Sequence, residues 1–226
     1  MLVIHYTGMP DCGEALDRLC DPAAKVSAHY LIARDGTAWR MVAEDRRAWH
    51  AGVSRWGGVT DVNGASIGIE LDNPGHEWGY VPFTEPQMAR LIGLARDILD
   101  RHPIPPVGVV GHSDVAPSRK TDPGELFDWR RLAAAGIGLW PEDLPDAAGR
   151  ALGPGDSGPA VAALRRDLAR FGWGVDAGDD YDAVLEAVVV AFQRHFRPER
   201  VDGVFDPDCA ARLSGLLLIS GTGGRS

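Results

Sequence analysis

Short apolar runs, each bounded by glycine, proline, asparagine or aspartate, recur through the first half of the chain. Runs of about four to eight residues that are rich in β-branched and aromatic side chains are typical of strands. The runs of this kind are LVIHY at 2–6, YLIA at 30–33, TAWRMV at 37–42, SIGIEL at 66–71 and VGVVG at 107–111. The pair Asp35-Gly36 between the second and third runs predicts a hairpin turn.

A different periodicity follows the fourth run. The segment Thr84-Glu85-Pro86-Gln87 has the form of a capping box, and the apolar residues after it recur at helical spacing. These apolar residues are Met88, Leu91, Ile92, Ala95, Ile98 and Leu99. Strands that alternate with helices are typical of α/β folds. Residues 1–140 are therefore predicted to form an α/β domain with a mixed sheet and flanking helices.

The composition changes after Trp140. Residues 141–152 are rich in proline, glycine and acidic side chains, which predicts a linker and few contacts between the parts on either side of it. Beyond the linker, three apolar stripes predict a small all-α domain of three helices at 153–218. The stripes are Val161, Leu164, Leu168 and Phe171, then Val184, Val188, Phe192 and Phe196, and a third that Asp206-Pro207 opens and that ends near Leu217. The tail at 219–226 is predicted to be disordered.

The charge of the chain argues against one class of partner. The sequence has 23 lysines and arginines against 32 acidic residues, a formal charge of -9, and so it has no excess of cations to neutralise phosphates. Nucleic acid is therefore not expected as a partner. No apolar run approaches the ~18 residues that a membrane span needs. The oligomeric state stays open at this point.

The first residues bear on the compartment. The chain opens MLVIHYTG, without the basic and apolar segments of a signal peptide, which predicts a cytoplasmic protein. A buried strand at the first residue is unusual, however, because domain termini are normally loose. A start further upstream, with a location in the cell envelope or periplasm, is the alternative.

The cysteines do not indicate a disulfide-stabilised fold. Cys12, Cys20 and Cys209 are an odd number without a CxxC pair, so neither a set of disulfides nor a thiolate zinc cluster is indicated. A Cys12–Cys20 disulfide is left open.

The segment GHSDVAPSRKTDPG at 111–124 concentrates ionisable groups in a loop that follows an apolar strand. A single histidine or loop aspartate is usually structural, so His112 and Asp122 alone indicate little. His5 changes this interpretation, because it lies within an otherwise apolar strand and a buried imidazole needs partners for two nitrogens. Two histidines and a carboxylate with an open fourth position form a catalytic zinc shell. His5, His112 and Asp122 are therefore the candidate zinc ligands.

Hydrolysis at such a zinc also needs a proton acceptor and a group that stabilises an oxyanion. Glu70 lies on a strand between Ile69 and Leu71, whose side chains point to the opposite face. Without further context Glu70 would be a surface strand residue. Lys120 would by default be a solvated loop cation, but beside a zinc site it can stabilise an oxyanion.

These motifs together resemble a known family. The segments VIHYTG, SAHYLIARDGTAWRMV, RAWHAGVSRW, NGASIGIEL and GHSDVAPSRKTDPG, in this order, are similar to the zinc N-acetylmuramoyl-L-alanine amidases of the amidase type 2 family. The resemblance implies that His5, His112 and Asp122 bind zinc, that Glu70 is the general base and that Lys120 assists. Phage relatives place a tyrosine before the histidine of the second motif, where this chain has Ala28, and this shifts weight to Glu70.

Other residues of the same motifs are candidates for substrate binding. They are His29, Trp49, His50, Asn63 and Arg119. We expect His50 and Asn63 near the sugar and peptide of the substrate, and the guanidinium of Arg119 near a peptide carboxylate. Trp49 is as well explained by a place in the core as by a place on the wall of a groove, and Arg119 as well by a place on the surface.

The C-terminal sequence resembles the three-helix peptidoglycan-binding domain. Gly155, Gly158, Phe192-Gln193 and Asp202-Gly203 match its pattern, but Leu185 stands where that pattern has threonine. The two resemblances predict hydrolysis of the amide between N-acetylmuramic acid and L-alanine in peptidoglycan or muropeptides. The alternative is a peptidoglycan-recognition protein of the same fold that binds without cleaving.

Overall fold

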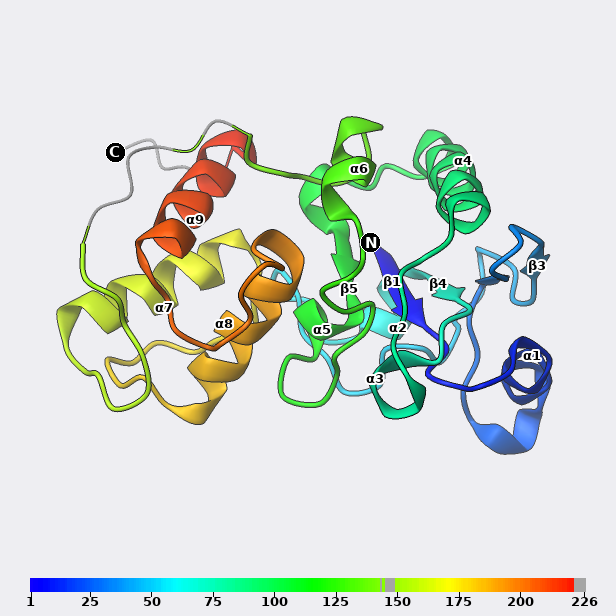
Figure 1. Ribbon diagram of the computed structural model, residues 1–226, viewed down its shortest axis with the longest axis horizontal. Helices are drawn as coiled ribbons and strands as arrows, with labels where there is room; N and C mark the ends of the chain where they lie inside the picture. The colour runs from blue at the N-terminus through cyan, green and yellow to red at the C-terminus, as the bar shows by residue number, and fades with distance from the viewer. Residues whose placement is uncertain (143, 145–148, 222–226) are drawn as a thin grey trace.

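The computed structural model describes residues 1–142, 144 and 149–221. Figure 1 shows two parts side by side, an α/β part formed by residues 1–142 and a helical region formed by residues 149–221. Five residues of the predicted linker, 143 and 145–148, and residues 222–226 of the predicted tail lie outside the described residues. The domain limits at 140 and 153 therefore stay predictions.

The α/β part is built on a five-stranded mixed sheet in the order β3-β2-β4-β1-β5. The strands are β1 (Leu2–Tyr6), β2 (Tyr30–Ile32), β3 (Ala38–Arg40), β4 (Ile67–Leu71) and β5 (Val109–Gly111). Strand β1 pairs in parallel with β4 and β5, β2 pairs in parallel with β4, and β3 is antiparallel to β2. The predicted strands and the Asp35-Gly36 hairpin are confirmed; β1 has the predicted bounds and the other strands are shorter than predicted.

The helices and 3-10 turns connect and cover these strands. In the α/β part they are α1 (Cys12–Cys20), η1 (Pro22–Ala24), α2 (Val62–Ala65), α3 (Gly75–Trp78), α4 (Glu85–Arg101), η2 (Pro106–Gly108), α5 (His112–Val115) and α6 (Trp129–Ala134). The helical region contains α7 (Pro159–Phe171), α8 (Ala183–Phe196) and α9 (Pro207–Ile219). The helix after Thr84 and the three C-terminal helices were predicted, whereas α1 and the short helices were not.

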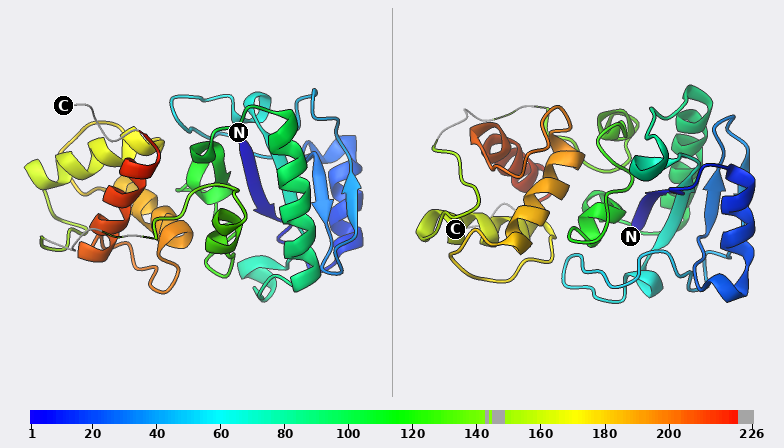
Figure 2. Two further views of the ribbon diagram at one scale, coloured as in Figure 1. Left: turned by 90° about the horizontal axis from the view of Figure 1, so that it is seen from above. Right: turned by 60° about the horizontal axis from the view of Figure 1, so that its bottom comes forward.

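The two faces of the sheet have different roles. Alternate residues of β1 and β4, including Leu2, Ile4 and Ile69, pack with the apolar side of α4, which lies along this face (Figure 2). Side chains of a strand alternate between faces, so Val3, His5 and Glu70 project from the other face. That face carries the candidate catalytic residues.

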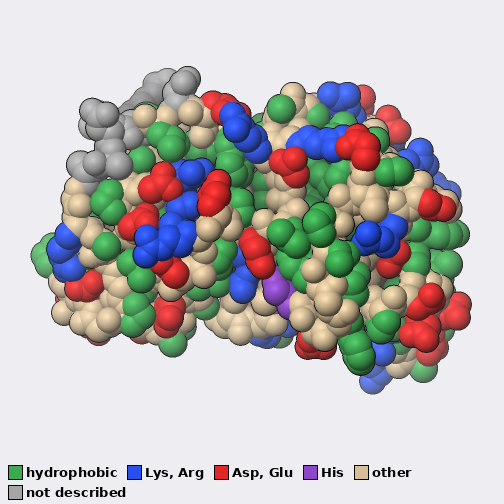
Figure 3. Space-filling model, viewed as in Figure 1, with side chains coloured by type: hydrophobic (Ala, Val, Ile, Leu, Met, Phe, Trp, Pro, Cys, Tyr) green, Lys and Arg blue, Asp and Glu red, His purple; other side chains and the backbone are tan. Residues whose placement is uncertain are grey.

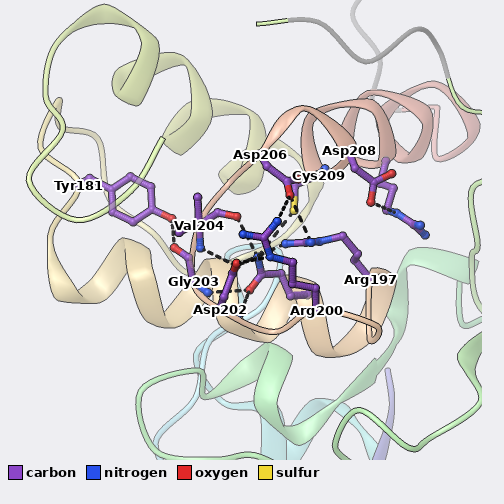
Figure 4. A network of polar contacts seen from close by, with 11 residues as sticks. Tyr181, Arg197, Arg200, Asp202, Gly203, Val204, Asp206, Asp208 and Cys209 are labelled. Carbon is purple, nitrogen blue, oxygen red and sulfur yellow. Dashed lines mark hydrogen bonds and ion pairs between the residues drawn. The ribbon is translucent and has the colours of Figure 1, made fainter. Parts of the chain in front are cut away.

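The helical region has a polar network at its centre. The Gln193 amide donates to Asp202 Oδ1 and Val204 O, each at 2.9 Å, and its oxygen accepts from the backbone N–H groups of Asp202 and Gly203. Figure 4 shows Asp202 gathered with Arg197 and Asp206 around the same turn, with Arg197 paired to both carboxylates. The amide side chain thereby fixes the turn between α8 and α9.

Leu185, which replaces the expected threonine, is fully buried near the start of α8. Its backbone N–H donates to the side chain of Asp182, which caps the helix. Val184, in contrast, is 48% exposed and does not belong to the predicted apolar stripe.

The expectation that few contacts connect the two parts is wrong. Trp56, from the α/β part, packs against Phe171 and Trp173 of the helical region, with ring centroids 6.1 and 5.1 Å away. The N–H of Gly57 donates to the carbonyl of Gly172 at 2.8 Å. Gly172 has φ +152, and a Cβ there would lie 2.6 Å from the Trp56 ring, so the close approach requires glycine. The composition of a linker describes the linker alone and does not reveal such distant partners.

A buried polar contact crosses the same interface. His195 Nδ1 of α8 lies 2.7 Å from Asp114 Oδ2 of α5, and the imidazole stacks on the Trp129 ring at 3.8 Å. The same Asp114 oxygen accepts the backbone N–H of Gly111 at 2.7 Å. The helical region is therefore tied to the backbone immediately before His112.

Two further expectations concern covalent structure and membranes. The three cysteines are free, and Cys12 and Cys20 occupy opposite ends of α1, eight residues or about 12 Å apart, so the disulfide left open is not formed. Within the described residues, no helix is long and apolar enough to cross a bilayer. The predicted compartment stays a prediction.

We predict that His195→Ala lowers the free energy of unfolding by about 3 kcal/mol, because it removes the side-chain partner of the buried Asp114 carboxylate and leaves only the Gly111 N–H. Denaturant unfolding of the full chain measures this. His102→Ala, which removes a half-buried histidine bound to Glu44, is the control and should cost about 1 kcal/mol or less. Equal effects of the two substitutions would contradict a structural role for the contact between the two parts.

Candidate active site

The carboxyl ends of three parallel strands bring the candidate residues together. His5 and Glu70 are direct partners in the β1–β4 register, so their side chains lie side by side on one face. Gly111, the last residue of β5, pairs with Ile4, and His112 follows it beside His5. The loop after α5 returns Asp122 to the same place, where its carbonyl accepts the N–H of Ser113 at 2.8 Å.

Three candidate ligand atoms form a small triangle. His5 Nδ1 lies 3.0 Å from His112 Nδ1 and 3.1 Å from Asp122 Oδ2, and the latter two atoms are 3.0 Å apart. All three side chains are buried, and they form the one His, Cys, Asp or Glu group of this geometry among the described residues. The structure thus brings the three predicted ligands together.

The tautomer of His112 follows from the hydrogen-bond partner of its Nε2 atom. Nε2 lies 3.1 Å from the carbonyl oxygen of Ala51, which can only accept, so Nε2 carries the hydrogen. In the neutral imidazole, Nδ1 is then a lone pair directed at the triangle.

A longer chain of contacts fixes His5. The hydroxyl of Ser66 donates to the carbonyl of Val62 at 2.5 Å and therefore accepts from His50 Nε2 at 3.2 Å. His50 Nδ1 is then an acceptor for His5 Nε2 at 2.9 Å, which leaves a lone pair on His5 Nδ1. Gly68 permits this arrangement, because a Cβ there would lie 2.6 Å from the His50 ring.

Three electron-pair donors, two imidazole nitrogens and one carboxylate oxygen, therefore face one point with no hydrogen between them. Atoms bound to tetrahedral zinc at ordinary lengths are separated by about 3.3 Å, close to the spacing here. The carbonyl partner of His112 Nε2 is of the kind expected around metal-bound imidazoles, and His50 Nδ1 is an acceptor in the same position for His5. The donor set fits a zinc ion.

Electrostatics keep His5 and Asp122 in their metal-binding forms. Burial, followed by the nearby His112, lowers the pKa of His5 to about 4. Burial alone would raise the pKa of Asp122, but His112 and His5 outweigh it and hold that pKa below its usual range. Near neutral pH His5 is thus neutral and Asp122 is ionised.

A cavity of about 490 Å³ opens beside the triangle and is also lined by Glu70 and Lys120. Glu70 is 8% exposed, and its Oε2 has no hydrogen-bond partner among the described residues. Burial and the charge of Asp122 raise the pKa of Glu70 well above its ordinary value, against the opposing effect of Lys120. A buried carboxyl of this kind, facing a cavity, is suited to exchange protons with a bound molecule.

The remaining predicted residues differ in position. His50 and Arg119 line the cavity, although Arg119 also donates to the carbonyls of Ala51 and Val53. His29 is fully buried and uses both nitrogens on backbone groups, of Gly68 and Arg46, so the structure does not bring it to the cavity.

Asn63 and Trp49 do not line the cavity. Asn63 accepts the N–H groups of His50 and Ala51 and so holds the turn that carries His50. Trp49 is 51% exposed and lines a neighbouring groove. It is not part of the core.

The residues that line one side of the cavity were not predicted from the sequence. The hydroxyl of Tyr6 lies 2.9 Å from His76 Nδ1 and 2.8 Å from Thr121 Oγ1, and all three residues line the cavity. His76 Nε2 in turn lies 3.2 Å from the carboxylate of Glu125. Tyr6 and Thr121 were within quoted motifs, but His76 carries no local signal.

The comparisons with known proteins agree with this geometry. The family model described as N-acetylmuramoyl-L-alanine amidase matches residues 1–125, and a model described as putative peptidoglycan binding domain matches residues 157–213. This chain belongs to the N-acetylmuramoyl-L-alanine amidase family. The amidase is thus an enzyme, and the alternative of a recognition protein without catalysis is not favoured.

Relatives resemble the amidase over different lengths. The N-acetylmuramoyl-L-alanine amidase AmiD of Escherichia coli is 41% identical over 96% of this chain and 82% of its own length. The 1,6-anhydro-N-acetylmuramyl-L-alanine amidase AmpD of Enterobacter cloacae is 44% identical but covers only 59% of this chain, with 79% of its own length matched.

Solved structures extend the likeness to both parts of the chain. A complex of AmiD from E. coli with anhydro-N-acetylmuramic acid-L-Ala-D-gamma-Glu-L-Lys superposes with a TM-score of 0.84 at 39% identity, over 98% of this chain and 90% of that one. AmpDh3 from Pseudomonas aeruginosa in complex with anhydromuramic pentapeptide gives 0.83 at 34% identity, over 97% and 91%. The arrangement of the α/β part and the helical region is therefore shared.

We predict that Glu70→Gln changes the pH dependence of stability in the metal-free protein. The pKa of Glu70 is higher in the folded protein than in the unfolded chain, where it is near 4.5. The stability that Glu70 contributes is therefore complete below the unfolded pKa and is lost as the pH rises toward the folded pKa. The amide of glutamine does not titrate. The variant should therefore gain about 1 kcal/mol or more over the natural chain between pH 4.5 and pH 8.

Denaturant unfolding in the presence of a chelator at both pH values gives the comparison. Glu77→Gln, which changes an exposed acid on the same cavity, is the control and should show no such gain. A stability difference between Glu70→Gln and the natural chain that stays constant with pH would contradict the raised pKa.

Proposed function

We propose that the amidase hydrolyses the amide between the lactyl group of N-acetylmuramic acid and the L-alanine of the stem peptide, with zinc held by His5, His112 and Asp122. One observation carries this proposal: two imidazole lone pairs, fixed by their outer hydrogen bonds, and one carboxylate oxygen face one point beside a buried carboxyl and an open cavity. The activity named for the relatives and the ligands bound in their structures supply the substrate class.

Glu70 is the proton carrier in this proposal. Its carboxylate accepts a proton from the water that attacks the amide carbonyl carbon, and it returns that proton to the leaving nitrogen of L-alanine as the C–N bond breaks. The raised pKa makes Glu70 a stronger base than an exposed carboxylate, and also a competent acid after it has been protonated. When bound, zinc supplies Lewis acidity toward the carbonyl oxygen and the attacking water.

Lys120 stabilises the charge that develops on the carbonyl oxygen. Its ammonium group lines the cavity close enough to Glu70 to oppose the rise of that pKa. A fixed cation that meets an oxyanion in a partly dehydrated cavity is worth more than the same cation in water.

We propose soluble 1,6-anhydro muropeptides as substrates, since the name of AmpD and the ligands of the AmiD and AmpDh3 complexes contain an anhydro muramic sugar. Binding of intact wall by the helical region is the second part of the proposal, supported by the peptidoglycan-binding family model. Comparison of products from anhydro muropeptides and from intact sacculi, by mass spectrometry, decides which form is cleaved.

We predict that Glu70→Gln reduces turnover of an anhydro muropeptide by at least about 100-fold while the zinc content is unchanged, because shape is retained but the proton acceptor is lost. Release of the free peptide is followed by mass spectrometry, and zinc by elemental analysis. Glu77→Gln should retain near-normal turnover. Turnover of Glu70→Gln within tenfold of the natural chain would assign the base to another group.

A further inference from the structure

A second groove adjoins the catalytic cavity on the side of the helical region. It has a volume of about 420 Å³, and one wall is the loop Pro117–Thr121. The other wall is one face of α8, with Glu186, Val190 and Arg194 at helical spacing. Because Arg119, Lys120 and Thr121 line both spaces, the groove and the cavity meet at this loop.

Arg194 connects this groove to the cavity. Its Nε is shielded from solvent and has no hydrogen-bond partner among the described residues, and it lies 3.7 Å from Glu125 Oε2. Glu125 contacts His76, which contacts Tyr6 on the cavity wall. In Figure 3, basic, acidic and histidine side chains lie together where the two halves of the molecule meet. The Nε side of the guanidinium thus faces Glu125, while Arg194 also lines the groove that adjoins the cavity.

The opposite end of the cavity has a different character. A smaller groove of about 200 Å³ shares Leu19 and Val26 with the cavity and contains Trp49. Half of the Trp49 side chain is exposed, and its ring offers an apolar face of the kind that packs on a sugar ring. Figure 1 shows α1, which ends beside this groove, and α8 on opposite sides of β1.

We propose that the stem peptide of the substrate leaves the cavity past Lys120 and enters the groove along α8, where Arg194 binds one of its carboxylates, while the sugar lies toward Trp49. This inference rests on the proposed function. A γ-linked glutamate keeps a free α-carboxylate, and an extended tripeptide reaches about 10 Å from the scissile amide. Guanidinium groups suit carboxylates, and the groove on this side is lined by three cations, Arg119, Lys120 and Arg194, against one carboxylate, Glu186.

The test compares two substrates that differ only in peptide length, N-acetylmuramoyl-L-alanine and N-acetylmuramoyl-L-Ala-D-γ-Glu-L-Lys. With the full chain, Arg194→Gln should raise the KM for the tripeptide compound about tenfold, which is the effect of losing a charged hydrogen bond. The kcat and KM for the short compound should stay unchanged. Arg194→Lys should recover part of the loss. Arg166→Gln, an exposed arginine of α7, is the matched control and should change neither substrate.

Binding of both compounds to Glu70→Gln, with and without Arg194→Gln, is measured by calorimetry. This separates the two proposals, because binding reports on the groove even if neither compound is hydrolysed. A tenfold weaker affinity for the tripeptide compound alone supports the groove. Equal losses for both compounds, no loss for either, or no binding of the tripeptide compound would overturn the assignment.

Discussion

The active-site structure depends on the convergence of three buried atoms, two imidazole nitrogens with lone pairs and one carboxylate oxygen, which lie within 3.1 Å of one another. Such a convergence is costly unless a cation occupies it, since each group has given up hydration without gaining a donor. The fold maintains it from outside: the Ala51 carbonyl orients one imidazole, and the chain from Ser66 through His50 orients the other. The sheet order, the glycine beneath His50 and the loop that returns Asp122 all serve this geometry. Glu70 acts beside it because the register of β1 and β4 makes it the neighbour of His5.

The helical region is part of this arrangement and not a separate attachment. Its residue His195 binds the carboxylate that also holds the backbone of Gly111, one residue before a candidate metal ligand. The aromatic contact between Trp56 and Trp173 closes the rest of the interface. A part of the chain that binds wall polymer would then hold the catalytic part in a fixed orientation, which a flexible tether does not. The groove along α8 follows from the same packing, because neither part forms it alone.

Local patterns predicted much of the fold. Apolar runs located the strands, the capping box located the start of α4, and helical stripes located the three C-terminal helices. The resemblance placed His5, His112, Asp122, Glu70 and Lys120 in one site, and the structure brings them to one cavity. What the sequence did not show depends on approach between distant segments. His29 and Asn63 share motifs with cavity residues but face backbone groups. His76, His195 and Trp56 have roles only through partners 40 or more residues away, for which no spacing rule exists.

The most direct measurement is zinc-edge anomalous diffraction from crystals of the full chain prepared without chelators, together with elemental analysis of His112→Ala. We expect one zinc per chain, bound by Nδ1 of His5, Nδ1 of His112 and Oδ2 of Asp122, and its loss in the variant. His102→Ala, at a half-buried histidine that binds Glu44 and not the triangle, should keep its zinc. Anomalous density at another position, or full zinc content in His112→Ala, would contradict the account.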